Sequence, residues 1–182
     1  MLPRLLVLGA LVGTAACSTG LGYLSPFPPT SPASPESERD AAVAAALSHA
    51  FIEPGNVPGG HTLPQRRRIA LCAELGCWDG GPLDSLTARM LPTSDRVEFV
   101  LLSRSDLETL AREVGTVTYG VVGRPEIAGD SAEVFVGVRS LVREGLGATR
   151  AFRHGGSGYV LRFEKRAGAW RPAARGVRYY VN

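Results

Sequence analysis

The sequence lacks most of the features that would identify a specialised protein. Its three cysteines and three histidines show no CxxC or paired His/Cys spacing, so we expect no metal centre. No apolar run reaches the roughly 18 residues of a membrane span. The net charge of +3 is too small to indicate a nucleic-acid-binding protein. What remains is an ordinary globular composition, 45% hydrophobic and 20% charged over 182 residues, which favours one compact domain.

Motifs for nucleotide binding and covalent catalysis are absent as well. The sequence contains neither GxxxxGK[ST] nor a complete GxGxxG. The segment His154-Gly155-Gly156-Ser157-Gly158 is similar to an esterase oxyanion loop, but the GxSxG nucleophile motif is missing because Tyr159 follows Gly158. We interpret residues 154–158 as a flexible connection, and we expect no cofactor and no catalytic group here.

The first 17 residues have the form of a secretory leader. Arg4 is the only charge before Glu36, residues 5–12 are apolar, and residues 13–16 are small or polar. The segment Thr14-Ala15-Ala16-Cys17 resembles the lipobox of bacterial lipoprotein signals, with Thr14 where leucine is usual. The resemblance implies that Cys17 is acylated, with fatty chains such as palmitate, and becomes the mature N-terminus. The alternative is an ordinary leader cleaved near Ala16, which explains the third cysteine less well.

Acylation would place the protein at a membrane. Each buried methylene contributes about 0.8 kcal/mol, so two acyl chains would hold a soluble domain stably at the surface. By the same resemblance, Ser18 in place of aspartate implies the periplasmic face of the outer membrane, if the organism has one. We therefore predict a signal peptide at residues 1–16, a lipidated cysteine and linker at 17–37, and one domain at 38–182. The linker, rich in proline and serine, is expected to extend by about 3.1 Å per residue as a stalk, on the order of 50 Å in all.

The domain opens with helical patterns. Ser37 followed by Glu38 and Asp40 predicts a helix start. Apolar residues then recur on one face as far as Phe51. Residues 69–75 predict a short second helix that ends near Gly76. The preceding arginines, 66–68, are interpreted as a solvated helix start, with contact to an anionic lipid or polysaccharide as the alternative.

Two cysteines flank the end of this second predicted helix. Cys72 and Cys77 enclose a short loop, and a disulfide between them would restrict the unfolded chain by roughly 2 kcal/mol in an oxidising compartment. A continuous helix would place the two cysteines on different faces, so the bridge requires the break at Gly76. Two separate buried thiols and a metal or redox role remain open as alternatives.

The second half of the domain is predominantly predicted as strands. Residues 97–102 predict a strand, and Ser105 to Glu108 has the form of a capping box for a helix that stops at Gly115. Alternating residues then predict adjacent strands at 117–121 and 134–138. Residues 159–164 predict a further strand, a turn follows at 166–168, and the chain ends in a hairpin-like segment that includes residues 177–181.

This order resembles the curved-sheet domains of the nuclear transport factor 2-like group. The resemblance covers residues 38–182 and rests on early helices, a short helix between strands, and a terminal segment, 158–165, followed by Trp170. It implies an α+β fold in which N-terminal helices pack on a curved antiparallel sheet with a C-terminal β-meander. Domains of this group act as hydrolases, isomerases, ligand binders and assembly modules, so the resemblance leaves the function open.

Charge is distributed unevenly. Residues 139–182 carry nine arginines and one lysine against two glutamates, a net charge of +8, whereas the first 138 residues carry 10 basic and 15 acidic side chains, a net charge of −5. A basic surface that includes Arg171, Arg175 and Arg178 would bind phosphate or carboxylate groups. A solvated sheet face that uses arginine without binding anything is the alternative.

The three histidines are interpreted structurally. His49 falls on the first helix as a surface or packing residue, while His61 and His154 fall in loops as hydrogen-bonding groups rather than acid–base catalysts.

The sequence therefore predicts a noncatalytic domain anchored by lipid to the bacterial cell envelope. Its expected partners are the membrane itself and an envelope protein or anionic envelope polymer, and nucleic acid is not expected. The alternative is a small-molecule-binding enzyme with its pocket in the curved sheet.

Overall fold

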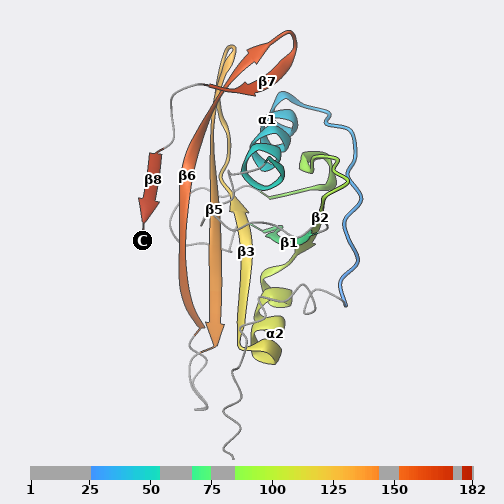
Figure 1. Cartoon of the computed structure of the whole chain (residues 1–182), viewed down its shortest axis with the longest axis vertical. Coiled ribbons are helices and arrows are strands. Elements are labelled where there is room, and N and C mark those ends of the chain that lie inside the picture. Colours follow the sequence, from blue (N-terminus) through green and yellow to red (C-terminus); the bar gives the residue numbers. More distant parts are fainter. Residues whose placement is uncertain (1–25, 54–66, 75–84, 144–151, 174–177, 182) are drawn as a thin grey trace, which may run out of the picture.

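The computed structural model describes residues 26–53, 67–74, 85–143, 152–173 and 178–181. In this part of the chain the fold is mixed α+β, with a sheet curved like half a barrel and two α-helices (Figure 1). The elements in chain order are α1 (Glu38–Leu47), η2 (Ser48–Ile52), β1 (Arg67–Cys72), η4 (Ala88–Met90), β2 (Val97–Leu102), α2 (Arg104–Val114), β3 (Thr116–Val122), β4 (Glu126–Ala128), β5 (Ser131–Arg143), β6 (Phe152–Arg166), β7 (Ala169–Pro172) and β8 (Arg178–Val181).

The strands of the described segments form one mixed sheet. Its main path runs β2-β1-β3-β5-β6-β7, with β4 also paired to β5 and β8 to β6. Strand β1 is parallel to both β2 and β3, and the other pairs are antiparallel. The predicted antiparallel sheet is therefore right for β3 to β8 and wrong for β1 and β2. Helix α2 supplies the crossover that two strands running in the same direction require.

The predicted second helix is wrong, because most of it is strand β1. The run from Ile69 to Cys72 is continuously apolar, and such a run fits either a buried strand or a short helix segment. Ala70 and Cys72 are buried in one core cluster, and Leu71 is buried in the other. A strand with parallel neighbours that is buried on both faces explains why the run shows no alternation.

Helix α1 begins where the sequence predicts. The Ser37 side chain accepts a hydrogen bond from the Asp40 amide at 3.1 Å, which caps the first turn. The Asp40 carboxylate in turn accepts one from the Glu36 amide. After Leu47 the chain widens into the π-helical turn η2, so the helical segment continues to Ile52.

Helix α2 is also confirmed, but it starts earlier than predicted. Its N-cap is Ser103, which forms a capping box with Asp106, rather than Ser105 with Glu108. Glu108 instead lies on the helix surface and contacts Arg104 at 3.1 Å. The helix stops at Gly115, whose φ of 82° is accessible to glycine.

The segment interpreted as a flexible connection, residues 154–158, belongs to strand β6. It pairs in regular antiparallel register with β5, Gly156 opposite Arg139 and Gly158 opposite Gly137. The interpretation was wrong because these glycines lie in the interior of a strand, where the missing side chains of Gly156 and Gly158 make room for large neighbours. The turn after β6 is confirmed: Ala167 and Gly168 both have positive φ, as a two-residue hairpin turn requires.

Buried apolar residues form two clusters. The first joins α1 and η2 to residues of β5, β6 and β7, and includes Phe163 and Trp170. The second joins α2 to residues of β1, β2 and β3. Strands β1 and β2 contribute alternate residues to each cluster, so they separate the two. In Figure 1, α1 lies beside the upper part of the long strands and α2 beside their lower part.

Part of the predicted linker lies against the folded body. The Thr30 amide donates a hydrogen bond to the carbonyl of Phe99 at 2.8 Å, and the Ala33 amide donates one to the carbonyl of Ala88 at 2.9 Å. Phe27 packs against the second core cluster. We call residues 27–36 the strap. It follows the outer edge of β2 and leads into α1 (Figure 1).

Candidate interaction surface

The structure describes only some of the predicted site residues. Cys17, Cys77 and Arg175 lie outside the described residues. Arg171 is exposed on β7, opposite Glu164 of β6. Arg178 is opposite Val160 in the register of β8 and β6, and its side chain lies outside the description. The register therefore places the backbones of Arg171 and Arg178 along the same edge of β6, opposite residues 164 and 160 of that strand.

Charged side chains of β5, β6 and β7 alternate in sign on one face of the sheet. Residues opposite each other in adjacent strands share a face, and so do every second residue along a strand. Glu133 of β5 lies opposite Arg162 of β6, and Glu164 lies opposite Arg171. We call this surface the charged face. It consists of Glu126, Glu133, Arg162, Glu164, Arg166 and Arg171.

Two carboxylates of the charged face, those of Glu133 and Glu164, pair with two of its arginines. Arg162 Nε lies 2.5 Å from Glu133 Oε1, and Arg166 Nη2 lies 2.6 Å from Glu164 Oε2. The described arginines here therefore do not make a uniformly basic surface. A count along the sequence cannot show this, because Glu133 comes from an earlier strand and antiparallel pairing brings it next to Arg162.

These ion pairs contribute little to folding. The Arg162 and Glu133 side chains are 44% and 40% exposed, and exposed pairs typically contribute about 0.2–1 kcal/mol. Charges held so weakly can exchange partners at low cost. The charged face is therefore suited to meet a protein surface of complementary alternating charge.

Further along the same strand, β5 carries a buried arginine that sequence reasoning did not single out. Arg139 is only 5% exposed and lies opposite Tyr119 of β3 and Gly156 of β6. Burial lowers the pKa of Arg139, and its electrostatic interaction with Tyr119 works in the opposite direction. A Cβ at Gly156 would lie 2.6 Å from Arg139 Cδ, so the arginine side chain extends over the backbone of β6.

Phe135, four residues earlier on β5, also lies over glycines. A Cβ added at Gly158 would meet the ring of Phe135, and one added at Gly137 would lie 3.1 Å from the same ring. Three glycines on adjacent strands thus accommodate one aromatic and one cationic side chain. The sequence signal was present as the repeated glycines of residues 155–158, but its meaning depends on the strand register.

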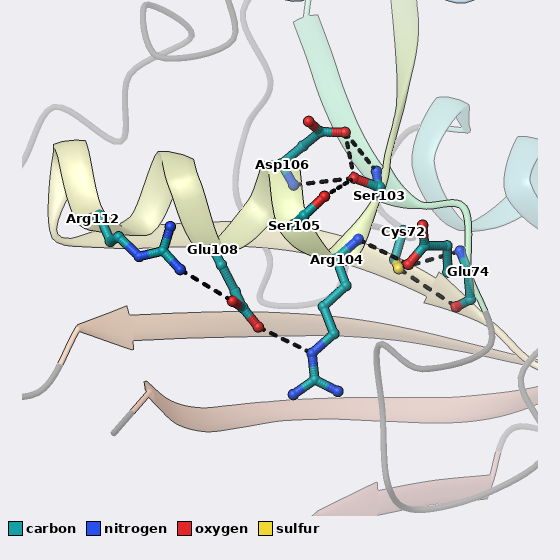
Figure 2. A network of polar contacts seen from close by, with 8 residues as sticks. All are labelled: Cys72, Glu74, Ser103, Arg104, Ser105, Asp106, Glu108 and Arg112. Carbon is teal, nitrogen blue, oxygen red and sulfur yellow. Dashed lines mark hydrogen bonds and ion pairs between the residues drawn. The ribbon is translucent and has the colours of Figure 1, made fainter. Parts of the chain in front are cut away.

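Cys72 lies at the start of a polar network at the N-terminal end of α2 (Figure 2). It is disulfide-bonded, and its partner lies outside the described residues, so the pairing with Cys77 stays a prediction. The Glu74 amide approaches Cys72 Sγ at 3.5 Å, and the Glu74 carboxylate accepts a hydrogen bond from the Arg104 amide at 3.2 Å. The end of β1 is thereby connected to the first turn of α2.

The rest of this network stabilises α2. Asp106 accepts a hydrogen bond from the Ser103 amide at 3.0 Å, and Arg104, Glu108 and Arg112 form two ion pairs along the exposed side of the helix. Glu74 and Asp106 place carboxylates at the N-terminus of α2, where the helix dipole favours negative charge. We therefore assign this region a structural role: it holds the end of β1 against the start of α2.

The histidines form no shared centre in the described structure. His49 lies in η2, where its Nδ1 is 2.6 Å from Glu53 and its ring meets the edge of Phe163. This agrees with a packing role. His61 lies outside the described residues, and His154 lies within β6 rather than in a loop, with its side chain outside the description. Among the described residues no group of three or more His, Cys, Asp or Glu side chains could hold a metal ion.

Comparisons with known proteins do not assign this chain to a family. No family model, curated protein or solved structure matches the chain. In the described residues no helix is long and apolar enough to cross a membrane.

Proposed function

We propose that this protein is a lipid-anchored envelope domain that binds another protein through the charged face. The observation that carries the proposal is the alternation of charge across β5, β6 and β7, with the exposed Arg171 beside Glu164. Between the two partner classes that the sequence suggests, mixed charge favours a protein. A polyanion would be repelled by the glutamates among the arginines.

The anchor in this proposal rests on the leader sequence. The lipobox-like segment ending at Cys17 supports acylation, and Ser18 supports the periplasmic face of the outer membrane in an organism that has one. We further propose that the body belongs with the nuclear transport factor 2-like curved-sheet domains. The curved sheet and the burial of α1 in the same cluster as β5 and β6 support this.

Crosslinking in intact cells, followed by recovery of the protein, tests the partner. We expect Arg171→Glu to reduce the recovered partner several-fold, because it places a second carboxylate opposite Glu164, where the signs of the two charges now differ. A triple variant with Arg178→Glu and Arg175→Glu as well replaces all three predicted contact arginines, of which Arg178 lies opposite Val160 of β6. Arg96→Glu is the matched control, since Arg96 is also exposed but precedes β2 at the other edge of the sheet. Equal recovery from Arg171→Glu and Arg96→Glu would count against the charged face.

A small-molecule enzyme is the second candidate, and one pair of side chains favours it. Glu53 contacts Nδ1 of the half-buried His49, which is how a carboxylate orients an imidazole in acid–base catalysis. The π-helical turn that carries His49 is a geometry frequent at functional sites. A hydrolytic substrate screen tests this candidate: an activity lost in both His49→Gln and Glu53→Gln would support it, and no turnover in the unaltered protein would remove it.

A further inference from the structure

The strap connects the body to the proposed anchor in an ordered way. Its body contacts recur every third residue: Phe27 packs on the second core cluster, Thr30 and Ala33 donate hydrogen bonds, and Glu36 pairs with Arg89 at 2.7 Å. A polyproline II helix has about three residues per turn, so every third residue shares a side. The five prolines of this region, which cannot donate a hydrogen bond, all fall between these positions or just outside them.

Thr30 contacts β2 through both its backbone amide and its side-chain hydroxyl. Its amide donates to Phe99, and its hydroxyl oxygen accepts a hydrogen bond from the Leu101 amide at 3.1 Å. The strap therefore satisfies backbone groups on the outer edge of β2, the terminal strand of the sheet path. An edge covered in this way is closed to pairing with another chain.

The strap also determines the side of the body from which the chain runs toward Cys17. It runs antiparallel to β2, because Ala33 lies beside Ala88 before that strand and Thr30 lies beside its later residues. Its first residue, Phe27, packs on the cluster that contains α2. Figure 1 shows the strap starting at the level of α2 and rising to α1.

Docking of the strap shortens the tether. From Cys17 to Phe27 the chain advances ten residues, which can span at most about 36 Å. If the strap were released, the first fixed residue would be Ser37, and twenty residues could span at most about 72 Å. Docking thus halves the maximal reach and moves the point of attachment from the α1 side to the α2 side.

We infer that the docked strap holds the α2 side of the body toward the membrane and turns the opposite end away from it. This inference rests on the proposed acylation of Cys17. The end that faces away is the turn at Asp130, just before β5. The other end of β5 lies beside Gly115, the residue at which α2 ends. The twelve residue steps of β5 between these two ends span about 40 Å. The charged face begins beside this turn and is thereby presented to partners outside the membrane surface.

The test uses the acylated full-length chain in phospholipid vesicles that carry a headgroup quencher. A fluorophore is attached either at Thr109, exposed on α2, or at Asp130, exposed in the turn before β5. We expect quenching to be several-fold stronger at Thr109 than at Asp130. Equal quenching at the two positions in vesicle-bound protein overturns the inference while leaving the anchor intact. If the chain isolated from native membranes carries no acyl group at Cys17, the proposed anchor is wrong and the inference falls with it.

Proline substitutions separate docking from linker stiffness. Thr30→Pro with Ala33→Pro removes both amide donors and preserves the extended conformation. We expect this pair to bring the two quenching values together and to speed hydrogen exchange at the Leu101 amide. The control pair, Ser31→Pro with Ser34→Pro, adds the same number of prolines at exposed positions between the contacts and should behave like the unaltered protein. Quenching that does not respond to the first pair, although Leu101 exchanges faster, contradicts the inference.

Discussion

Two neighbouring glycines illustrate how much a single residue position depends on strand register. Gly155 and Gly156 are adjacent in β6, yet a Cβ at Gly155 would meet nothing within 4 Å, whereas one at Gly156 would collide with the Val138 carbonyl and with Arg139. The sequence shows both as members of one glycine-rich segment. Only the pairing with β5 shows that they face opposite sides of the sheet.

The same substitution at these two positions should have opposite effects. We expect Gly156→Ala to lower the free energy of unfolding by about 1–3 kcal/mol, because neither the backbone carbonyl nor the buried arginine can move away freely. Gly155→Ala should leave stability unchanged or raise it by up to about 1 kcal/mol, since alanine loses less conformational entropy in a strand than glycine. Urea denaturation of both variants measures the difference, and equal losses would show that the register of β5 and β6 is wrong.

At the scale of elements, local signals predicted the helices better than the central strands. The cap at Ser37, the stop at Gly115 and the strand at 97–102 could be predicted because each depends on nearby residues. Strand β1 could not, since its pairing partners lie some thirty and fifty residues away in β2 and β3 and its buried run shows no period. The start of α2 was misplaced by two residues because Ser103 and Ser105 both have an acidic residue three positions later.

Serine substitutions test the observed start of α2. Ser103→Ala should reduce the free energy of unfolding by about 0.5–2 kcal/mol, because the N-cap side chain and its capping box are lost. Ser105→Ala removes one contact between hydroxyl groups at an exposed position, so its effect should stay within about 0.5 kcal/mol. Thermal or urea unfolding of the two variants decides between them, and a larger loss for Ser105→Ala would restore the start predicted from the sequence.

Charge at the two ends of α2 gives a second prediction at this scale. Glu74→Gln removes a carboxylate that contacts the N-terminal end of α2, where the helix dipole favours negative charge, and should cost about 0.3–1 kcal/mol at low salt. Glu113→Gln is its counterpart near the C-terminal end, where the dipole disfavours the carboxylate, and should be neutral or slightly stabilising. Both effects should shrink as salt is added, and the same sign for both variants would contradict this account of the network.

At the scale of the whole molecule, the sequence predicted an excess of positive charge near the C-terminus but not its arrangement. The nine arginines after residue 138 include one that is buried, Arg139, and two that contact glutamates on the sheet, Arg162 and Arg166. A sum of charges along the chain contains no information about such partners. The linker shows the same limit. Its composition predicts an extended chain, but the spacing of three residues between its contacts depends on the folded body against which it lies.

The anchor makes a prediction for the intact protein. In cells, Cys17→Ser should move the protein from the membrane fraction to the soluble envelope fraction, since it removes the thiol that the proposed acyl chains would modify. Fractionation followed by immunodetection measures the change. Unaltered membrane association of the Cys17→Ser variant would mean that something other than lipid holds the protein there.

The most direct measurement is the intact mass of the mature protein extracted from native membranes. We predict a chain that begins at Cys17 and carries diacylglyceryl on its sulfur. A mature chain that retains an unmodified Cys17, or that begins after it, would contradict the account.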